Sequence, residues 1–128
     1  MKRLQAFKFR LQPNGAQIRQ MQQFAGNTRK VWNLALARQQ EEHEAGNKFT
    51  NSFGMNAWLI DWKKEYDYLK KSPSQTLQQV TKDLDRAFKN FFEKRADFPK
   101  FKKKGFSNSF RLPQGCHLEQ QHSRIFLP

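Results

Sequence analysis

The pattern of hydrophobic and polar positions changes its period along the chain and predicts a different element each time. Over residues 5–11 hydrophobic side chains alternate with Ala, Lys and Arg, which predicts a half-buried strand whose outer face carries Lys8 and Arg10. A Pro-Asn-Gly turn at 13–15 ends this strand. From Ala16 onward hydrophobic residues recur every three or four positions, which predicts an amphipathic helix of about 30 residues.

Two more helices follow with the same period. One is expected over residues 55–69, and it is preceded by three residues of types that cap helices, Thr50, Asn51 and Ser52. The other begins with Ser72 as its N-cap and Pro73 in its first turn, and it runs to about Arg95. Helices of this length joined by short connections can bury their hydrophobic stripes only against each other.

The pattern changes again after the third helix. Residues 98–111 interleave Phe with Lys and Arg, and the short segments 116–119 and 124–127 have the character of strands. The order is therefore a strand, three helices and short strands, without an internal repeat. This order indicates an α+β fold.

The charge of the chain is positive and unevenly distributed. Its 128 residues include 24 Lys and Arg against 11 Asp and Glu, a net charge of +13. Residues 1–40 hold eight basic side chains and no acidic one, residues 41–97 hold ten of each, and residues 98–128 hold six basic and one acidic. A neutral middle between two basic ends predicts that the ends share one surface for a polyanion. A basic protein that binds nothing would not need this segregation.

Composition excludes several classes of protein. Cys116 is the only cysteine, so neither an internal disulfide nor a multi-cysteine zinc site can form. No apolar run approaches the roughly 20 residues that cross a bilayer, and the first residues lack the apolar stretch of a signal peptide. A cytoplasmic protein without membrane contact is therefore expected. With 37% hydrophobic residues and 13 Phe, the chain can build a core.

Catalytic and metal-binding residues are not expected. Asp83 and Asp85 stand two apart on the third helix and so do not face one metal ion together. Cys116, His117 and His122 lack a fourth partner, which makes a surface turn the better interpretation. There is no glycine-rich phosphate loop. We therefore expect no cofactor, no metal and no catalysis by this chain alone.

Two segments have the composition of nucleic-acid contacts. In residues 98–111 the basic side chains suit phosphates and the Phe rings suit unpaired bases, although the rings could equally belong to the core. Residues 72–79, at the start of the third helix, are rich in Ser, Gln and Thr. A polar helix start suits phosphates and base edges, although ordinary capping would look the same.

Five motifs in a fixed order carry a resemblance that composition does not. They are RKVWNLAL at 29–36, PSQTLQQ at 73–79, LDRAFKNFF at 84–92, PKFKKK at 99–104 and SFR at 109–111. Together they resemble the amino-terminal region of TnpB proteins. These are the OrfB proteins of bacterial insertion sequences, RNA-guided DNA endonucleases related to type V CRISPR effectors. The resemblance extends over essentially the whole chain.

The resemblance implies a fold, binding partners and a nuclease activity that resides in a domain outside this region. In that family a helical recognition domain is inserted between strands of a small β-barrel, the wedge domain. Here the wedge would comprise 1–13 and 98–128 as an incomplete barrel, and the three-helix recognition bundle would comprise 14–97. The implied partners are a guide RNA and a short duplex DNA motif beside the target. Because the family cleaves with a RuvC-like domain downstream of this region, no cleavage by this chain alone is expected, and a separate nuclease chain is a further expected partner.

The candidate binding site collects basic and polar residues from both ends of the chain and from the helices. The candidates are Lys8, Arg10, Arg29, Lys30, Asn33, Thr50, Asn51, Ser74, Gln75, Thr76, Gln78, Gln79, Lys82, Lys100, Lys102, Lys103, Lys104, Ser107, Asn108, Ser109 and Arg111. Two other functions fit these residues. One is a repressor of helix-turn-helix type that binds DNA through the third helix without RNA, and the other is a structural RNA-binding protein of ribosomal type. Dependence of duplex binding on RNA separates the first of these from the TnpB interpretation.

Overall fold

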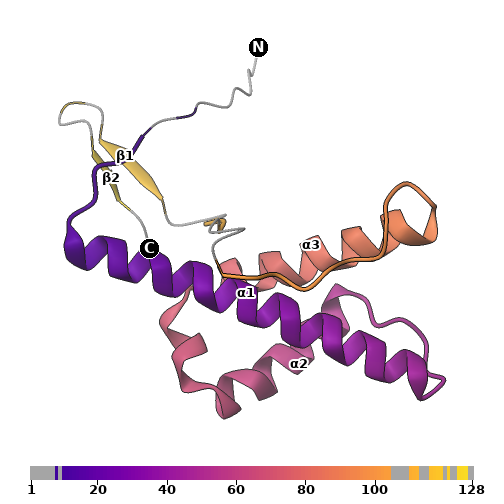
Figure 1. Cartoon of the computed structure of the whole chain (residues 1–128). Coiled ribbons are helices and arrows are strands. Elements are labelled where there is room, and N and C mark those ends of the chain that lie inside the picture. Colours follow the sequence, from indigo (N-terminus) through magenta and orange to yellow (C-terminus); the bar gives the residue numbers. More distant parts are fainter. Residues whose placement is uncertain are drawn as a thin grey trace.

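A computed structural model describes Lys8, residues 10–104, 110–112 and 116–119, Gln121 and residues 124–126. Its helices and strands follow one another in a simple order along the chain. They are α1 (Gly15–Glu44), α2 (Ser52–Glu65), the 3₁₀ helix η1 (Asp67–Lys71), α3 (Ser74–Phe92), β1 (His117–Glu119) and β2 (Arg124–Phe126). The helix α1 runs the length of the molecule, with α2 and α3 packed along it (Figure 1). The strand pair lies beside the start of α1, away from the other helices.

Both ends of α1 are fixed by local sequence. Asn14 is its N-cap, and the side chains of Asn14 and Gln17 each accept the other residue's backbone N–H at 2.9 Å. At the other end Gly46 takes a positive φ of 83°, and the N–H groups of Gly46 and Asn47 turn back onto the carbonyls of His43 and Glu42. The predicted helix is confirmed, and it begins at Gly15, within the segment expected to be a turn.

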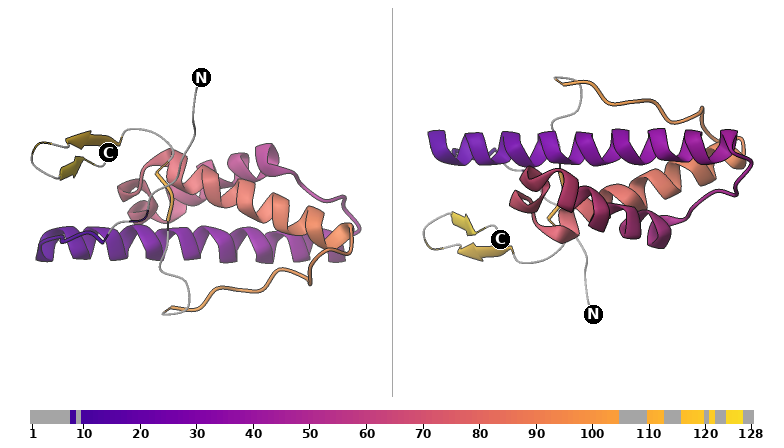
Figure 2. Two further views of the ribbon diagram at one scale, coloured as in Figure 1. Left: turned by 90° about the horizontal axis from the view of Figure 1, so that it is seen from above. Right: turned by 90° about the horizontal axis from the view of Figure 1, so that it is seen from below.

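The core lies where α1, α2, η1 and α3 meet, as the two views of Figure 2 show. It is built from the hydrophobic stripes that the sequence pattern predicts. Its buried members are Val31, Trp32, Ala35, Leu36, Met55, Leu59, Trp62, Leu69, Leu77, Val80, Leu84 and Phe88. Burial of such side chains contributes about 1.5–3 kcal/mol each before the entropy of ordering them is counted. The three helices are thus one packed unit.

Two helix boundaries differ from the sequence prediction. The second helix stops at Glu65, and the hydrophobic side chain of Leu69 reaches the core from η1 instead. The third begins at Ser74, because the expected N-cap Ser72 is buried and its hydroxyl accepts a hydrogen bond from Asn27 Nδ2 at 2.7 Å. A tertiary contact has here replaced a local cap.

The barrel expected of the α+β fold is not formed by the described residues. Of the expected first strand over residues 5–11, the structure describes Lys8, Arg10 and Leu11, and none of these is in a strand. The other residues of that segment lie outside the described part. The two strands expected at the end of the chain are confirmed as β1 and β2, which pair antiparallel. Two strands of three residues cannot close a barrel, so the described fold is a helical bundle with one strand pair.

None of the described helices is both long and apolar enough to cross a lipid bilayer.

Candidate nucleic-acid interface

Residues 99–104 form an extended segment, the basic strap, which runs back alongside α1 after leaving α3 (Figure 1). Two adjacent side chains of α1 hold its main chain. The indole N–H of Trp32 donates to the backbone oxygen of Lys100 at 2.8 Å. The amide of Asn33 donates to the backbone oxygen of Lys102 at 3.0 Å and accepts from the N–H of the same residue at 2.8 Å. The strap therefore has a fixed path along the helix.

The side chains of the basic strap divide between solvent and protein. Those that face solvent include Lys100, Lys103, Lys104 and the half-exposed ring of Phe101. Exposed ammonium groups around an exposed ring are the combination by which proteins bind single-stranded nucleic acid, with phosphates on the cations and a base on the ring. The strap presents this combination on a main chain that is already ordered.

Lys102 lies against α1 rather than in solvent. Its Nζ is 4.2 Å from the centre of the Trp32 ring, a cation–π contact. Partial burial lowers the pKa of Lys102, the nearby Arg111 lowers it further, and the carboxylate of Asp83 opposes both. Lys102 is therefore part of the attachment of the strap, with less freedom than its neighbours to reach a ligand.

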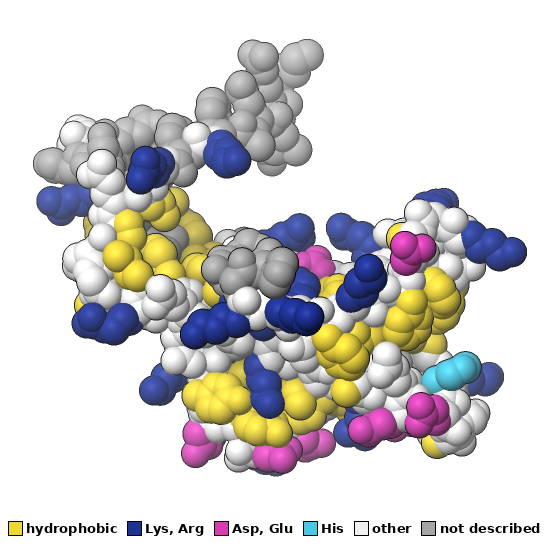
Figure 3. Space-filling view, viewed as in Figure 1, with side chains coloured by type: hydrophobic (Ala, Val, Ile, Leu, Met, Phe, Trp, Pro, Cys, Tyr) yellow, Lys and Arg dark blue, Asp and Glu magenta, His cyan; other side chains and the backbone are white. Residues whose placement is uncertain are grey.

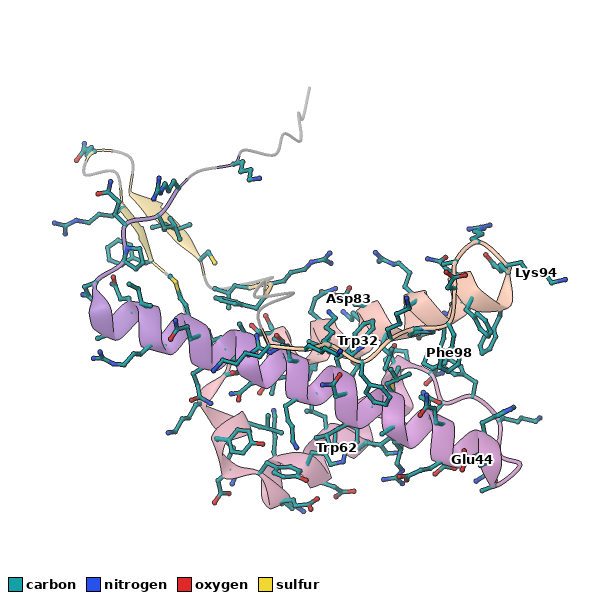
Figure 4. All side chains as sticks on the ribbon, in the orientation of Figure 1. Trp32, Glu44, Trp62, Asp83, Lys94 and Phe98 are labelled. Atoms are coloured by element: carbon teal, nitrogen blue, oxygen red, sulfur yellow. The ribbon has the colours of Figure 1, made fainter. Side chains whose placement is uncertain are left out.

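Asp83 connects α3 to the chain beyond the basic strap. Its Oδ1 accepts from Gln79 Nε2 at 3.1 Å and lies 3.3 Å from Nη1 of Arg111. Figure 4 shows Asp83 near Trp32, where the strap runs alongside α1. A negative charge thus lies beside the cations that the sequence assigned to phosphate, and Gln79 is engaged within the protein.

Asp85 faces a different direction, as its spacing from Asp83 predicts. It is buried, and its Oδ2 accepts the backbone N–H of Ser52 at 3.0 Å, while Lys89 Nζ lies 3.4 Å from its Oδ1. Asp85 therefore satisfies a donor at the start of α2. In the part of the chain that the structure describes, no three His, Cys, Asp or Glu side chains gather as metal ligands do.

The start of α3 presents only some of its predicted residues to solvent. Gln75 and Gln78 are exposed, and Lys82 follows on the same stripe. Ser74 is exposed and accepts from Lys63 Nζ at 3.0 Å. Thr76 is only 1% exposed and faces the core, so its side chain is not at the surface where a contact was expected.

Several predicted contacts are engaged with the protein itself. Lys30 Nζ lies 4.5 Å from the centre of the Tyr66 ring. Asn51 caps α2 by accepting the N–H of Gly54 at 3.1 Å. The N–H and C=O of Thr50 both pair with the side-chain amide of Gln39, at 3.2 and 2.6 Å. Asn51 is thus the helix cap that the sequence predicted, whereas the partners of Lys30, Thr50 and Asn33 within the protein were not anticipated.

The remaining candidates lie near the ends of the described chain. Arg29 is half-buried on α1, and Lys8 and Arg10 are exposed before it. Residues 107–109, which hold Ser107, Asn108 and Ser109, lie outside the described residues.

Charge is segregated on the folded surface as well as along the sequence. In the view of Figure 3 the acidic side chains gather mainly along the lower edge, on the side of α2. Lys and Arg spread over the upper part, where the basic strap and α3 lie. A polyanion would therefore be attracted to the strap side of the molecule.

Sequence reasoning missed two kinds of residue in this region. Trp32 is a core residue and Asn33 was assigned to binding, and both also hold the basic strap through contacts that no sequence signal indicates. Arg86 and Lys89 were not selected, yet both are exposed and extend the α3 stripe beyond Lys82. The steps of four residues from Lys82 to Arg86 and of three from Arg86 to Lys89 would have been a sufficient signal.

The basic strap is ordered and lies on the same side of the molecule as the polar and basic stripe of α3, so the two form a surface for a polyanion. Comparison with known families gives the class of protein that carries this surface. Residues 1–48 match the family model "Helix-turn-helix domain" of IS605-type OrfB proteins. Among the described residues of that range there is one helix, α1.

Two relatives identify the family more closely. The chain is 60% identical over 130 aligned positions to the "Putative RNA-guided DNA endonuclease InsQ" of Escherichia coli (strain K12), which covers all of this chain and 32% of the relative. It is 33% identical over 99 positions to a "Putative RNA-guided DNA endonuclease" of Streptomyces pristinaespiralis, covering 76% of this chain and 25% of that protein. The chain belongs to the TnpB/OrfB family, as its motifs predicted, and it spans a quarter to a third of the length of these curated relatives.

Proposed function

We propose that this chain is the nucleic-acid-binding region of a TnpB-like RNA-guided DNA endonuclease. The observation that carries the proposal is the attachment of the basic strap to α1 by Trp32 and Asn33. The attachment orders the main chain while leaving three lysines and one ring exposed. Ordering a flexible basic segment costs free energy at the moment of binding, and a segment that is ordered beforehand avoids this cost.

The partners in this proposal are a guide RNA and a short duplex motif beside the DNA target. The printed names of the relatives, which are RNA-guided DNA endonucleases, support both. The basic strap and the exposed cations before α1 would contact phosphates, which requires no base sequence. The exposed stripe of α3 with Gln75, Gln78 and Lys82 would approach the duplex, where Gln can pair with an adenine edge.

The domain division is part of the same proposal. Residues 14–97 would form the recognition domain, and residues 1–13 and 98–128 would contribute to a wedge domain. The pairing of β1 with β2 supports a small β-structure in the last part of the chain. The chain by itself would bind without cleaving, and cleavage would require a nuclease domain, in the same protein or in a second chain.

A second candidate function is DNA binding without RNA, as in a repressor. The match of residues 1–48 to a helix-turn-helix model favours it. That match does not include α3, the helix to which this alternative assigns base recognition. Sequencing the RNA that co-purifies with the protein separates the two functions, because a repressor would carry no single enriched transcript.

The direct test of the proposal is the salt dependence of binding to a structured RNA. If about six cations contact phosphates, the slope of log affinity against log salt should be about −4 to −5. The variant Lys103→Gln/Lys104→Gln should make the slope less steep by about two. Lys64→Gln/Lys71→Gln is the matched control, since these lysines are equally exposed but lie on α2 and η1. A slope near zero, or equal effects of both variants, would contradict the proposal.

A further inference from the structure

A cavity of about 430 Å³ lies at the end of the molecule where α1 and α3 finish. One wall is aromatic and is formed by the rings of Phe49, Phe88, Phe91, Phe92 and Phe98. Its volume is within the range of about 300–1,000 Å³ that is usual for small-molecule sites. Of the segment 98–111, whose rings the sequence offered either to unpaired bases or to the core, Phe98 lines the cavity, but no residue of the basic strap does.

The aromatic wall is held together by edge-to-face contacts. Phe98 packs against Phe88 and Phe91 with ring centroids 5.4 and 5.2 Å apart, both at 88°. Phe49 packs against Phe92 at 5.5 Å and 84°. Even so, Phe92 remains 55% exposed and Phe98 39% exposed. Large rings that are ordered by their neighbours but still open to solvent are suited to stacking on a planar ligand.

The opposite wall is polar and comes from α1. Gln40, His43 and Glu44 recur at the spacing that places them on one face of the helix. Among the described residues no hydrogen bond is recorded for these three side chains. In Figure 4 Glu44 and Phe98 lie on either side of this end of the molecule, and Figure 3 shows the histidine directly below a hydrophobic patch. The cavity thus has rings on one side and unused hydrogen-bonding groups on the other.

We infer that this cavity binds one unpaired base of an RNA strand. A base presents an apolar face and a polar edge, and the cavity offers a ring wall for the first and amide, imidazole and carboxylate groups for the second. A carboxylate such as that of Glu44 accepts from the exocyclic amino groups that adenine, cytosine and guanine carry. A hydrophobic protein segment would leave this polar wall without partners, which is costly.

The surroundings of the cavity also suit the phosphates on each side of such a base. Lys48 lines the cavity and Lys94 lies at the outer edge of the same end (Figure 4). Both are exposed, and no ion pair is recorded for either within the described part of the chain. The inference rests on the proposed function, because it requires that a single-stranded segment of RNA reach this protein.

The test compares two RNA strands of about a dozen nucleotides, one with bases and one with abasic ribose units, which carry the same phosphates. The protein should bind the base-bearing strand about tenfold more tightly, since stacking of a single base contributes on that order. In a Phe101→Ala background, which removes the exposed ring of the basic strap, Phe92→Ala and Gln40→Ala/Glu44→Ala should each reduce this ratio to about one. The double variant leaves the ring packing intact, so it tests the cavity even if Phe92→Ala lowers stability.

Phe53→Ala is the matched control, because Phe53 is 83% exposed on α2 and does not line the cavity. It should leave the ratio at about ten. Photo-cross-linking of a strand that contains iodouridine should label a peptide that includes residues 88–98. Equal binding of the two strands by the unaltered protein, or labelling confined to the basic strap, would overturn the inference while the proposed function stood. Failure of both strands to bind would overturn both.

A second copy of the chain is the other occupant to consider. Self-association in sedimentation that Phe92→Ala abolished would assign the cavity to a protein partner and overturn the inference.

Discussion

Asn33 and Gln39 lie less than two turns apart on α1 and make the same bidentate contact with two different segments. Each side-chain amide donates to a backbone C=O and accepts the N–H of the same residue, which is Lys102 for Asn33 and Thr50 for Gln39. Gln39 is only 5% exposed, whereas Asn33 is half-buried. The Gln39 contact holds the connection between α1 and α2, and the Asn33 contact holds the basic strap.

The comparison separates architecture from binding. The connection held by Gln39 leads directly into Asn51 and the start of α2, so its position determines how α2 packs. The basic strap ends no helix, and its exposed side chains are cations and a ring. The same contact therefore serves stability in one place and the ordering of a binding surface in the other.

The largest effect on stability is expected at the buried contact. Gln39→Ala removes the hydrogen-bond partners of the backbone N–H and C=O of Thr50. The free energy of unfolding should therefore fall by about 2–3 kcal/mol. Urea unfolding followed by circular dichroism measures it. Gln22→Ala, an exposed change on the same helix, should alter stability by only about 0.5 kcal/mol or less. A loss at Gln39 no larger than that would mean that the connection between α1 and α2 is held by other contacts.

At the basic strap, the corresponding substitution should change the affinity for RNA more than the stability. Asn33→Ala should lower the free energy of unfolding by only about 1 kcal/mol, but the affinity for RNA should fall roughly threefold to tenfold, because the strap must then be ordered on binding. Hydrogen exchange of the Lys102 amide should accelerate in parallel. Reduced affinity with unchanged exchange would instead make Asn33 a direct nucleic-acid contact, as the sequence suggested.

Removing the negative charge beside the strap should act in the opposite direction. Asp83→Asn abolishes the attraction that holds Arg111 and weakens the field that opposes phosphate, so RNA affinity should rise about twofold to fivefold at low salt. The gain should disappear at high salt. A loss of affinity would show that Asp83 acts mainly by ordering Gln79 and Arg111.

The smallest effect concerns the charge of Lys102, the residue that Asn33 holds. Thr50, which Gln39 holds in the same way, carries no charge. The pKa of Lys102 is lowered in the folded protein, so the unfolded chain binds the proton more tightly and stability should rise slightly as pH increases toward the ordinary lysine value of about 10.4. The group is only partly buried, so the change should be small. A side-chain NMR titration should place the midpoint of Lys102 below the ordinary lysine value, and a midpoint at that value would contradict the partial burial of its ammonium group.

The helices could be predicted from sequence because their signals are local. The capping box at Asn14 and the glycine at Gly46 each act within a few residues, and the hydrophobic stripes determine which faces are buried. Ser72 and Leu69 were misassigned because distant residues decided their positions. For such residues the local pattern is satisfied equally well by two conformations.

The binding surface was predicted in composition but not in detail. The lysines of the basic strap follow from the charge distribution, and the exposure of Lys100, Lys103 and Lys104 agrees with it. Thr50, Thr76 and Asn33 have the polar side chains of a binding site, yet the structure gives Asn33 and the backbone of Thr50 partners within the protein and buries the side chain of Thr76. A polar residue type does not reveal whether its partner is a base or a peptide group far away in the sequence. The aromatic cavity depends in the same way on residues brought together by folding.

The two amide contacts also differ in when they can form as the chain folds. The Gln39 contact joins residues 11 apart in sequence, whereas the Asn33 contact joins residues 69 apart. Closing the longer loop costs about 1.6 kcal/mol more in chain entropy by the logarithmic dependence on loop length. The Asn33 contact also requires that α3 has already been synthesised and packed, because the strap follows it. Docking of the strap is therefore a late folding event. Until the strap docks, the indole N–H of Trp32 lacks its partner, the Lys100 carbonyl, and the surface of α1 around it is not covered by the strap.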